Sequence, residues 1–291
     1  MSDGRNKPAE AVRNHDSGWP RDFLGNQFVY AVISQRARGL SLGVNLNPEK
    51  YCDFNCVYCE VKRGEPRAER PVDVNRMPRE LARMLDLAEA NKLGSLPRLG
   101  RIPAELLRLK EVALSGDGEP TLCPNFDAAV EAVLGVRAAR KHFFKIVLIT
   151  NTSGLFQPRV QRGWQQLATD DEIWVKLDAG TQAYLERVNR PDRLTLKDVT
   201  ANILRLGRLR PVVIQSLFPL LDGEEPEARE IDCYIHRLQE LAAAGAQISM
   251  VQIYSAHRPA QNPQCGHLQL TALSAIARRV REQTRLKAEV F

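Results

Sequence analysis

The chain has 291 residues, of which 44% are hydrophobic and 26% are charged, as is typical of a soluble globular protein. Its longest apolar runs, at 143–150 and 211–221, are shorter than the roughly 20 residues of a membrane-spanning helix. The N-terminus lacks the apolar core of a secretory signal, so the sequence predicts a cytoplasmic protein with no membrane partner. The 41 basic and 35 acidic residues give a net charge of +6, which suits an anionic or RNA substrate. The basic residues are scattered, however, and a solvated surface explains most of them.

Residues 1–22 are polar and without periodicity, which predicts a mobile tail, and residues 23–291 are expected to form one domain. Short hydrophobic runs in that domain predict strands at 40–46, 111–116, 145–150, 172–180, 211–219 and 247–255. Amphipathic segments predict helices at 79–90, 126–134, 160–167, 181–189, 195–207, 231–241 and 273–280. Loops rich in Arg, Pro and Gly are expected at 62–71 and 91–109. Hydrophobic strands that alternate with helices indicate a covered parallel sheet. Six such units predict an α/β fold, a partial (β/α)6 barrel of the TIM type.

Three cysteines fall within eight positions of the stretch YCDFNCVYCE, at Cys52, Cys56 and Cys59. The stretch follows the first predicted strand, at the C-terminal end of the barrel where chemistry collects. Thiols clustered in a reducing cytosol serve metals or catalysis rather than disulfides. A C-x3-C-x2-C loop can give one thiolate to each of three irons of a cubic cluster and leave the fourth iron open.

A structural zinc site is the alternative for these thiols, and it would need a fourth ligand, usually from a second C-x2-C pair. The other cysteines are isolated in the sequence and are expected to be small buried side chains: Cys123, Cys233 and Cys265. Counting ligands therefore favours an iron-sulfur cluster over zinc.

The cysteine loop, with the aromatic Tyr58 before its last cysteine, resembles the radical S-adenosylmethionine (radical SAM) superfamily. The turn SGDGEPTL at 115–122 is similar to the glycine-rich turn that follows the second strand in that superfamily. Four stretches in order resemble the subgroup of the tRNA wyosine-base synthases and related bacterial Fe-S oxidoreductases: SLGVNLNPEKYCDFNCVYCE, ALSGDGEPTL, LITNTSGL and VKLDAGTQAYLERVNRP. The archaeal wyosine synthases carry further cysteines before this loop, whereas here no cysteine precedes Cys52.

The resemblance implies a [4Fe-4S] cluster on Cys52, Cys56 and Cys59, with SAM chelated to the open iron. It also implies a one-electron donor of the flavodoxin or ferredoxin type. SAM would be cleaved to a 5'-deoxyadenosyl radical that takes hydrogen from the substrate. The candidates for binding SAM come from the cluster loop, the glycine-rich turn and the strand ends: Tyr58, Gly116, Asp117, Gly118, Glu119, Asn151, Gln215 and Tyr254.

Lys176 and Asp178 are candidate catalytic residues, because they end the fourth predicted strand two residues apart and so point to the same side. Lys176 could meet the SAM carboxylate and Asp178 the ribose hydroxyls, or the two could form an ion pair that closes the barrel top. His257, after the sixth predicted strand, is a candidate acid or base, or simply a solvated histidine. Arg36 and Arg38 could recognise a carboxylate or a phosphate.

Two functions are compatible with these patterns. The first is a radical SAM enzyme, expected to be monomeric, that acts on an anionic molecule. A tRNA base is its leading candidate substrate, with a small carboxylate or a peptide as alternatives. The second is a non-catalytic zinc- or Fe-S-bearing protein that binds RNA.

Overall fold

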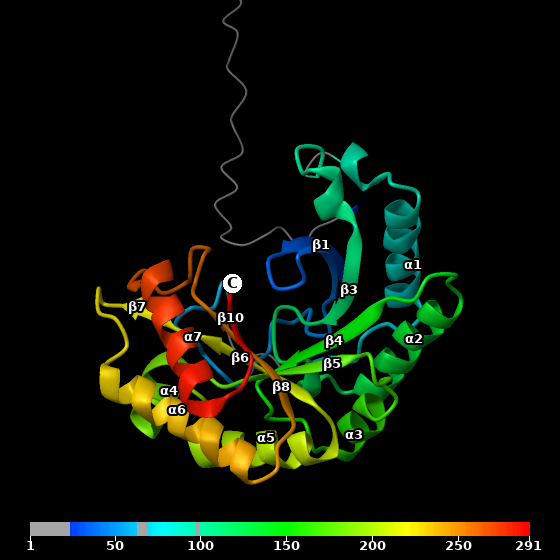
Figure 1. The fold of residues 1–291 in the computed structure, drawn as a ribbon. Coiled ribbons are helices and arrows are strands. Elements are labelled where there is room, and N and C mark those ends of the chain that lie inside the picture. The colour runs from blue at the N-terminus through cyan, green and yellow to red at the C-terminus, as the bar shows by residue number, and fades with distance from the viewer. Residues whose placement is uncertain (1–23, 63–68, 97–98) are drawn as a thin grey trace, which may run out of the picture.

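The computed structural model describes residues 24–62, 69–96 and 99–291. The predicted tail at 1–22 lies outside these residues, as does most of the predicted loop at 62–71. The described part folds around one curved eight-stranded sheet in the order β1-β2-β3-β4-β5-β6-β8-β10 (Figure 1). Its strands are β1 (Val29–Ser34), β2 (Gly39–Val44), β3 (Leu109–Leu114), β4 (Lys145–Thr150), β5 (Glu172–Lys176), β6 (Val212–Leu217), β8 (Ile248–Tyr254) and β10 (Ala288–Val290).

Helices surround the outer face of this sheet (Figure 1). They are α1 (Arg76–Glu89), α2 (Phe126–Ala138), α3 (Pro158–Trp164), α4 (Gln182–Val188), α5 (Leu196–Leu209), α6 (Ala228–Ala243) and α7 (Leu270–Thr284). Short 3-10 helices are η1 (Leu93–Ser95), η2 (Ala104–Leu107) and η3 (Pro120–Leu122), of which the first two fall in the predicted loop at 91–109. Among the described residues, no helix combines the length and the apolarity needed to cross a membrane.

The six central strands, β2, β3, β4, β5, β6 and β8, pair in parallel and correspond to the six predicted strands. The prediction of a partial TIM-like barrel is therefore confirmed. Both edges of the sheet were missed. β1 is antiparallel to β2, and β10 pairs with β8 over three residues. β10 is too short to show a pattern, and the turn between β1 and β2 lacks the Asn-Gly or Asp-Gly signal of a tight hairpin. A small antiparallel pair, β7 (Pro219–Leu221) with β9 (Cys265–His267), was missed as well.

The two faces of the sheet differ in chemistry, because successive side chains of a strand point to opposite sides. On β2, Leu40, Leu42 and Val44 are buried in the core between the sheet and the helices. Ser41 and Gly43, which alternate with them, line a cavity on the inner face. We call the space enclosed by this inner face the lumen. Because helices cover the outer face, a ligand can reach the strand ends from the lumen.

Candidate functional site

The cysteine loop leaves the C-terminal end of β2 and is held in place by the segment that follows α4. The backbone N–H groups of Asn55 and Val57 donate to the carbonyls of Asn189 and Val188, at 3.1 and 2.8 Å. All three cysteines of the loop are partly buried and none forms a disulfide. The loop therefore presents three cysteine thiols, none of them in a disulfide, at the end of the barrel that the sequence predicted.

The glycine-rich turn after β3 packs directly against the start of the cysteine loop. A Cβ atom at Gly118 would lie 1.8 Å from the carbonyl oxygen of Tyr51, and one at Gly116 would lie 2.2 Å from Oδ1 of Asn45. No side chain fits at either position, so the two glycines are what permits this close approach. Asp117, between them, accepts a hydrogen bond of 2.6 Å from Nδ2 of Asn45. The turn and the loop thus form one rigid unit.

Glu119 is buried and ties this turn to the end of β4. Its Oε1 accepts from the backbone N–H and the hydroxyl of Thr121, at 3.1 and 2.7 Å, and from the hydroxyl of Thr150 at 2.5 Å. Its Oε2 accepts from the backbone N–H of Asn151 at 2.7 Å. Burial raises the pKa of Glu119 to about 7, although these hydrogen bonds act in the opposite direction. Because a carboxylate oxygen can accept two hydrogen bonds, Oε2 keeps capacity for a ligand.

Two side-chain amides lie next to cysteine sulfurs. Nδ2 of Asn151 is 4.0 Å from Sγ of Cys52, and Nδ2 of Asn189 is 3.6 Å from Sγ of Cys56. N–H groups beside thiolates are a means by which proteins tune iron-sulfur clusters. No three His, Cys, Asp or Glu side chains of the described residues converge as ligands of a single metal ion. A cubic cluster instead takes one thiolate per iron, so this donor set fits a cluster better than a zinc ion.

Asp178 is the hub of the polar contacts behind the cysteine loop, and its side chain is fully buried. Oδ1 lies 3.0 Å from Nζ of Lys176 and accepts from the backbone N–H of Leu217 at 2.7 Å. Oδ2 accepts from the hydroxyl of Tyr58 at 2.5 Å and from Nδ2 of Asn189 at 2.6 Å. Lys176 and Asp178 thus form the ion pair that was one of the two expectations for them.

This network shifts the pKa values of Lys176 and Tyr58. Burial by itself lowers the pKa of Lys176, but the carboxylate of Asp178 and the hydroxyl of Tyr254 together outweigh it, and the net pKa lies above the ordinary value. Burial and the same carboxylate raise the pKa of Tyr58 well above its usual range. Lys176 is therefore an ammonium and Tyr58 a neutral hydrogen-bond donor at physiological pH.

Gln215 and Tyr254 continue the network along the lumen. The ammonium of Lys176 donates to the Tyr254 hydroxyl at 2.8 Å, and that hydroxyl donates to Oε1 of Gln215 at 3.1 Å. A cavity of about 1070 Å³ runs from these residues to the cysteine loop, where Tyr58 and Cys59 line it. The cavity also reaches Gly116 and Asp117. It is therefore continuous between the inner face of the sheet and the candidate cofactor residues.

The remaining predicted residues lie at the margin of the site. His257 is exposed at the edge of the cavity, and its Nε2 lies 3.3 Å from the carbonyl oxygen of Phe291. Cys123 is fully buried beside Asn125, and burial raises the pKa of its thiol to about 11. Cys123 is accordingly a buried core side chain, as expected.

Asn189 is a site residue that the sequence did not identify. It is 2% exposed and contacts Cys56, Tyr58 and Asp178 through one amide nitrogen. The only signal was its place in the stretch LERVNRP, which carried part of the family resemblance. Nothing local to that stretch indicates that it pairs with the cysteine loop.

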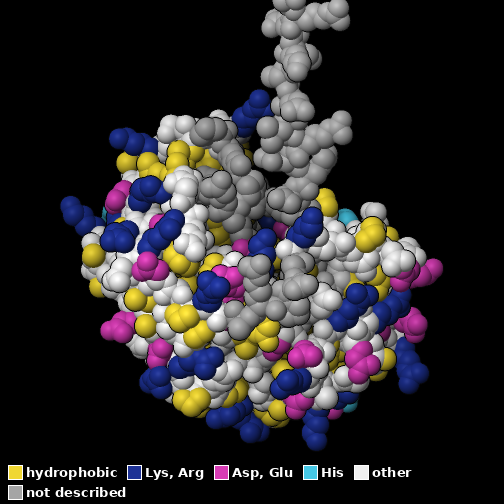
Figure 2. Space-filling view, turned by 180° about the vertical axis from the view of Figure 1, so that it is seen from behind, with side chains coloured by type: hydrophobic (Ala, Val, Ile, Leu, Met, Phe, Trp, Pro, Cys, Tyr) yellow, Lys and Arg dark blue, Asp and Glu magenta, His cyan; other side chains and the backbone are white. Residues whose placement is uncertain are grey.

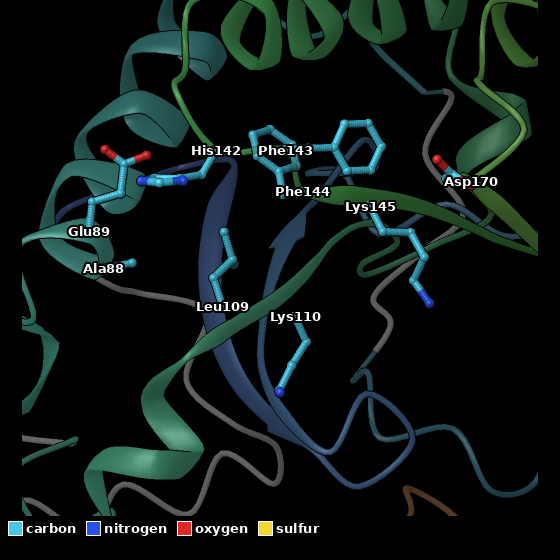
Figure 3. Close-up of a pocket in the computed structure, with 9 residues that line it drawn as sticks. All are labelled: Ala88, Glu89, Leu109, Lys110, His142, Phe143, Phe144, Lys145 and Asp170. Carbon is cyan, nitrogen blue, oxygen red and sulfur yellow. The ribbon is translucent and has the colours of Figure 1, made fainter.

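A second cavity, of about 500 Å³, lies at the N-terminal ends of β3 and β4, far from the cysteine loop along the strands (Figure 3). Leu109, Lys110, Phe143 and Phe144 are among the residues that line it, and Glu89 and Lys110 give it charges of both signs. In parallel barrels this end serves stability rather than chemistry. The cavity of the lumen is therefore the candidate active site.

Comparison with known sequences gives distant relatives, and no family model matches the chain. A UPF0026 protein of Helicobacter pylori is 26% identical over 226 residues, which are 77% of this chain and 66% of that protein. A UPF0026 protein of Synechocystis sp. is 28% identical over 164 residues, which are 56% of this chain and 52% of that protein. This chain thus spans less than two thirds of the length of these relatives.

Comparison with solved structures identifies the fold. SuiB of Streptococcus suis bound to S-adenosylmethionine matches 88% of this chain and 52% of its own, with a TM-score of 0.57 and 14% identity. TYW1 with a lysine-pyruvate adduct bound matches 86% of this chain and 75% of its own, with a TM-score of 0.53 and 19% identity. The chain shares the fold of these two proteins, a partial TIM-like barrel. In this fold the cysteine loop and the glycine-rich turn occupy the strand ends at which the sequence placed them.

Proposed function

We propose that this chain is a radical SAM enzyme that binds a [4Fe-4S] cluster through Cys52, Cys56 and Cys59 and S-adenosylmethionine beside it. The observation that carries the proposal is the set of three cysteine thiols on one loop, outside any disulfide and packed against a glycine-rich turn at the end of the barrel. The cluster and SAM, with one electron from a flavodoxin- or ferredoxin-type donor, would supply a 5'-deoxyadenosyl radical that takes hydrogen from the substrate.

The protein's own residues have the task of positioning these groups and excluding water. Asn151 and Asn189 place amide N–H groups beside two of the cysteine sulfurs. Gly116 and Gly118 let the turn approach the loop, and Glu119 offers Oε2 to the ammonium of SAM. Tyr58 is fixed by Asp178 at the end of the cavity, where an adenine ring could pack against it.

Anaerobic reconstitution with iron and sulfide tests the proposal against the alternative of a non-catalytic RNA-binding protein. We expect a brown protein that absorbs near ~400 nm, holds about four irons and releases 5'-deoxyadenosine from SAM after reduction. A colourless protein with a single bound zinc ion would support the alternative.

Glu119→Gln is expected to keep the iron but weaken SAM binding. The lost charge-assisted hydrogen bond is worth roughly 1.5 to 3 kcal/mol, or about 10- to 150-fold in Kd. Equilibrium binding of SAM to the reconstituted protein measures the effect, with iron content as the check on folding. Thr121→Val, which removes a hydroxyl donor to the same carboxylate but no charge, is the control and should change Kd less than about 10-fold. An unchanged Kd in Glu119→Gln would remove Glu119 from the SAM site.

For the substrate we propose an anionic molecule, with a tRNA base as the first candidate. Arginines flank the cysteine loop at 36, 38, 63, 67 and 70, of which 63 and 67 lie outside the described residues. Arg38 and Arg70 are largely exposed. Arg38 lies near the carboxylate of Glu289, and Arg70 lies near the carboxylate of Glu49. Figure 2 shows Lys and Arg side chains dispersed over the face it presents, with acidic side chains between them. Among the side chains coloured in this view, the basic ones form no single concentrated patch.

Binding of bulk tRNA is expected to weaken steeply as salt rises, if RNA is the substrate. Each phosphate neutralised contributes a slope of roughly 0.7 to 0.9 to the plot of log affinity against log salt. A titration between low and moderate salt measures the slope, and Arg70→Ala should reduce it by about one phosphate contact. Affinity that does not change with salt, or no binding at low salt, would reject tRNA and leave the radical chemistry untouched.

A further inference from the structure

Arg36 projects into the lumen from the turn between β1 and β2. Its guanidinium carbon lies 4.6 Å from the ring centroid of Tyr254 and 5.9 Å from that of Trp174. Within the described part of the chain this guanidinium has neither an ion-pair partner nor a hydrogen-bond acceptor, and its Nε is buried. A guanidinium stacked on aromatic rings keeps its N–H edge available for a planar anion, which it binds through two parallel hydrogen bonds. Arg36 is therefore held in place by ring contacts while its donors stay unused.

Glu111 offers the opposite charge in the same cavity. It lies on β3, is only 2% exposed, and lines the lumen together with Arg36. Oε1 accepts a hydrogen bond from the hydroxyl of Ser41 at 3.1 Å, but Oε2 is buried and has no partner. A buried carboxylate oxygen without a hydrogen-bond donor costs free energy of folding. A bound ligand that donates an N–H group to Oε2 of Glu111 would recover this free energy.

Two ion pairs account for other charges on the strands of the inner face, while Lys50 and Lys62 line the cavity from the two ends of the cysteine loop. Lys145 pairs with Glu172 at 2.9 Å near the start of the strands, and Lys176 pairs with Asp178 at 3.0 Å at their end. Among the described residues of the strands and of the β1–β2 turn that line the cavity, Arg36 and Glu111 are one positive and one negative charge without a direct ion pair. A ligand with a net charge would satisfy one of them and repel the other. A phosphate group would bring up to two negative charges close to Glu111, so the lumen favours a small zwitterion.

We propose that Arg36 and Glu111 are the two poles of a substrate subsite for a small zwitterion with the head group of an α-amino acid. Arg36 binds the carboxylate and Glu111 binds the ammonium group. The cavity joins this subsite to Tyr58 and Cys59, so the bound molecule faces the cluster loop. The role of the zwitterion as a substrate rests on the radical SAM function proposed above, whereas the binding of the zwitterion to the subsite does not.

The test is binding of the twenty proteinogenic amino acids, one at a time, to the reconstituted protein under anaerobic conditions, by thermal shift and then calorimetry. We expect at least one of them to bind. Its carboxamide, which lacks the carboxylate, and its deamino analogue, which lacks the ammonium, should each bind roughly 10- to 150-fold more weakly. Inorganic phosphate tests whether Arg36 belongs to a phosphate site instead, and it should not compete with the amino acid for binding.

Variants at the two poles of the subsite, with a control on the β1–β2 turn, separate loss of the subsite from general effects on folding. Arg36→Met and Glu111→Gln should each weaken amino-acid binding by roughly 10- to 150-fold while iron content is kept. Arg38→Met is the matched control for the subsite, because Arg38 lies on the same turn but is exposed and pairs with Glu289, and it should leave amino-acid binding and iron content unchanged.

The proposal is overturned if none of the twenty amino acids binds, if Arg36→Met binds as well as the unmodified chain, or if phosphate binds in their place. Amino-acid binding by a chain that takes up no iron and cleaves no SAM would retain the subsite and reject the radical SAM function. SAM cleavage without amino-acid binding would retain the radical SAM function and reject the subsite.

Discussion

Alanine at any one of Cys52, Cys56 and Cys59 is expected to abolish both iron uptake and SAM cleavage. Two remaining thiolates cannot hold three irons of a cubic cluster, and no fourth cysteine lies in the same loop. Iron content should fall from about four per chain to near zero, and the absorption near ~400 nm should disappear. Iron analysis and spectra of each variant after anaerobic reconstitution measure the effect.

The other cysteines provide matched controls for this experiment. Cys233 and Cys265 are partly buried like the three proposed ligands but belong to α6 and β9. Their alanine variants should keep full iron content. Cys123→Ala should also keep its iron, with some loss of stability because the thiol is buried in the core. Loss of iron from a folded Cys123→Ala variant would show that the assignment of three ligands is wrong.

Asp178→Ala is expected to lower the free energy of unfolding by about 3 to 5 kcal/mol, the cost of leaving a buried partner charge unpaired. The substitution removes the counter-charge of Lys176 and the acceptor for Tyr58, Asn189 and the backbone of Leu217. Because Tyr58 lies in the cysteine loop, iron uptake should fall as well. Chemical denaturation of the iron-free protein under reducing conditions isolates the effect on folding.

Two comparisons make this result specific. The exposed pair of Arg187 with Asp222, at 3.3 Å, is a matched ion pair at the surface, and Asp222→Ala should cost less than about 1 kcal/mol. The double variant Lys176→Ala/Asp178→Ala should be less destabilised than the sum of its single variants, because it leaves no unpaired charge. If Asp178→Ala lowered the free energy of unfolding by no more than Asp222→Ala does, the contacts of Asp178 would not stabilise the fold as proposed.

The sequence by itself determined the succession of the six central strands and the place of the chemistry. Each of those strands is a hydrophobic run followed by an amphipathic segment, so its type follows from local periodicity. The spacing of Cys52, Cys56 and Cys59, and of Lys176 and Asp178, is also local, because residues close in sequence have a fixed relative direction. The grouping of the three thiols on one loop and the inward pair were predictable for that reason.

Only the tertiary structure decided which distant residues complete the site. Asn189 reaches Cys56 at the end of the barrel, and Arg36 reaches the rings of Trp174 and Tyr254 in the lumen. These contacts depend on the order and curvature of the strands and on the edge strand β1, none of which has a local signal in the chain. Periodicity gives the face to which a side chain points, but the partner that it meets there is set by the order and the curvature of the strands.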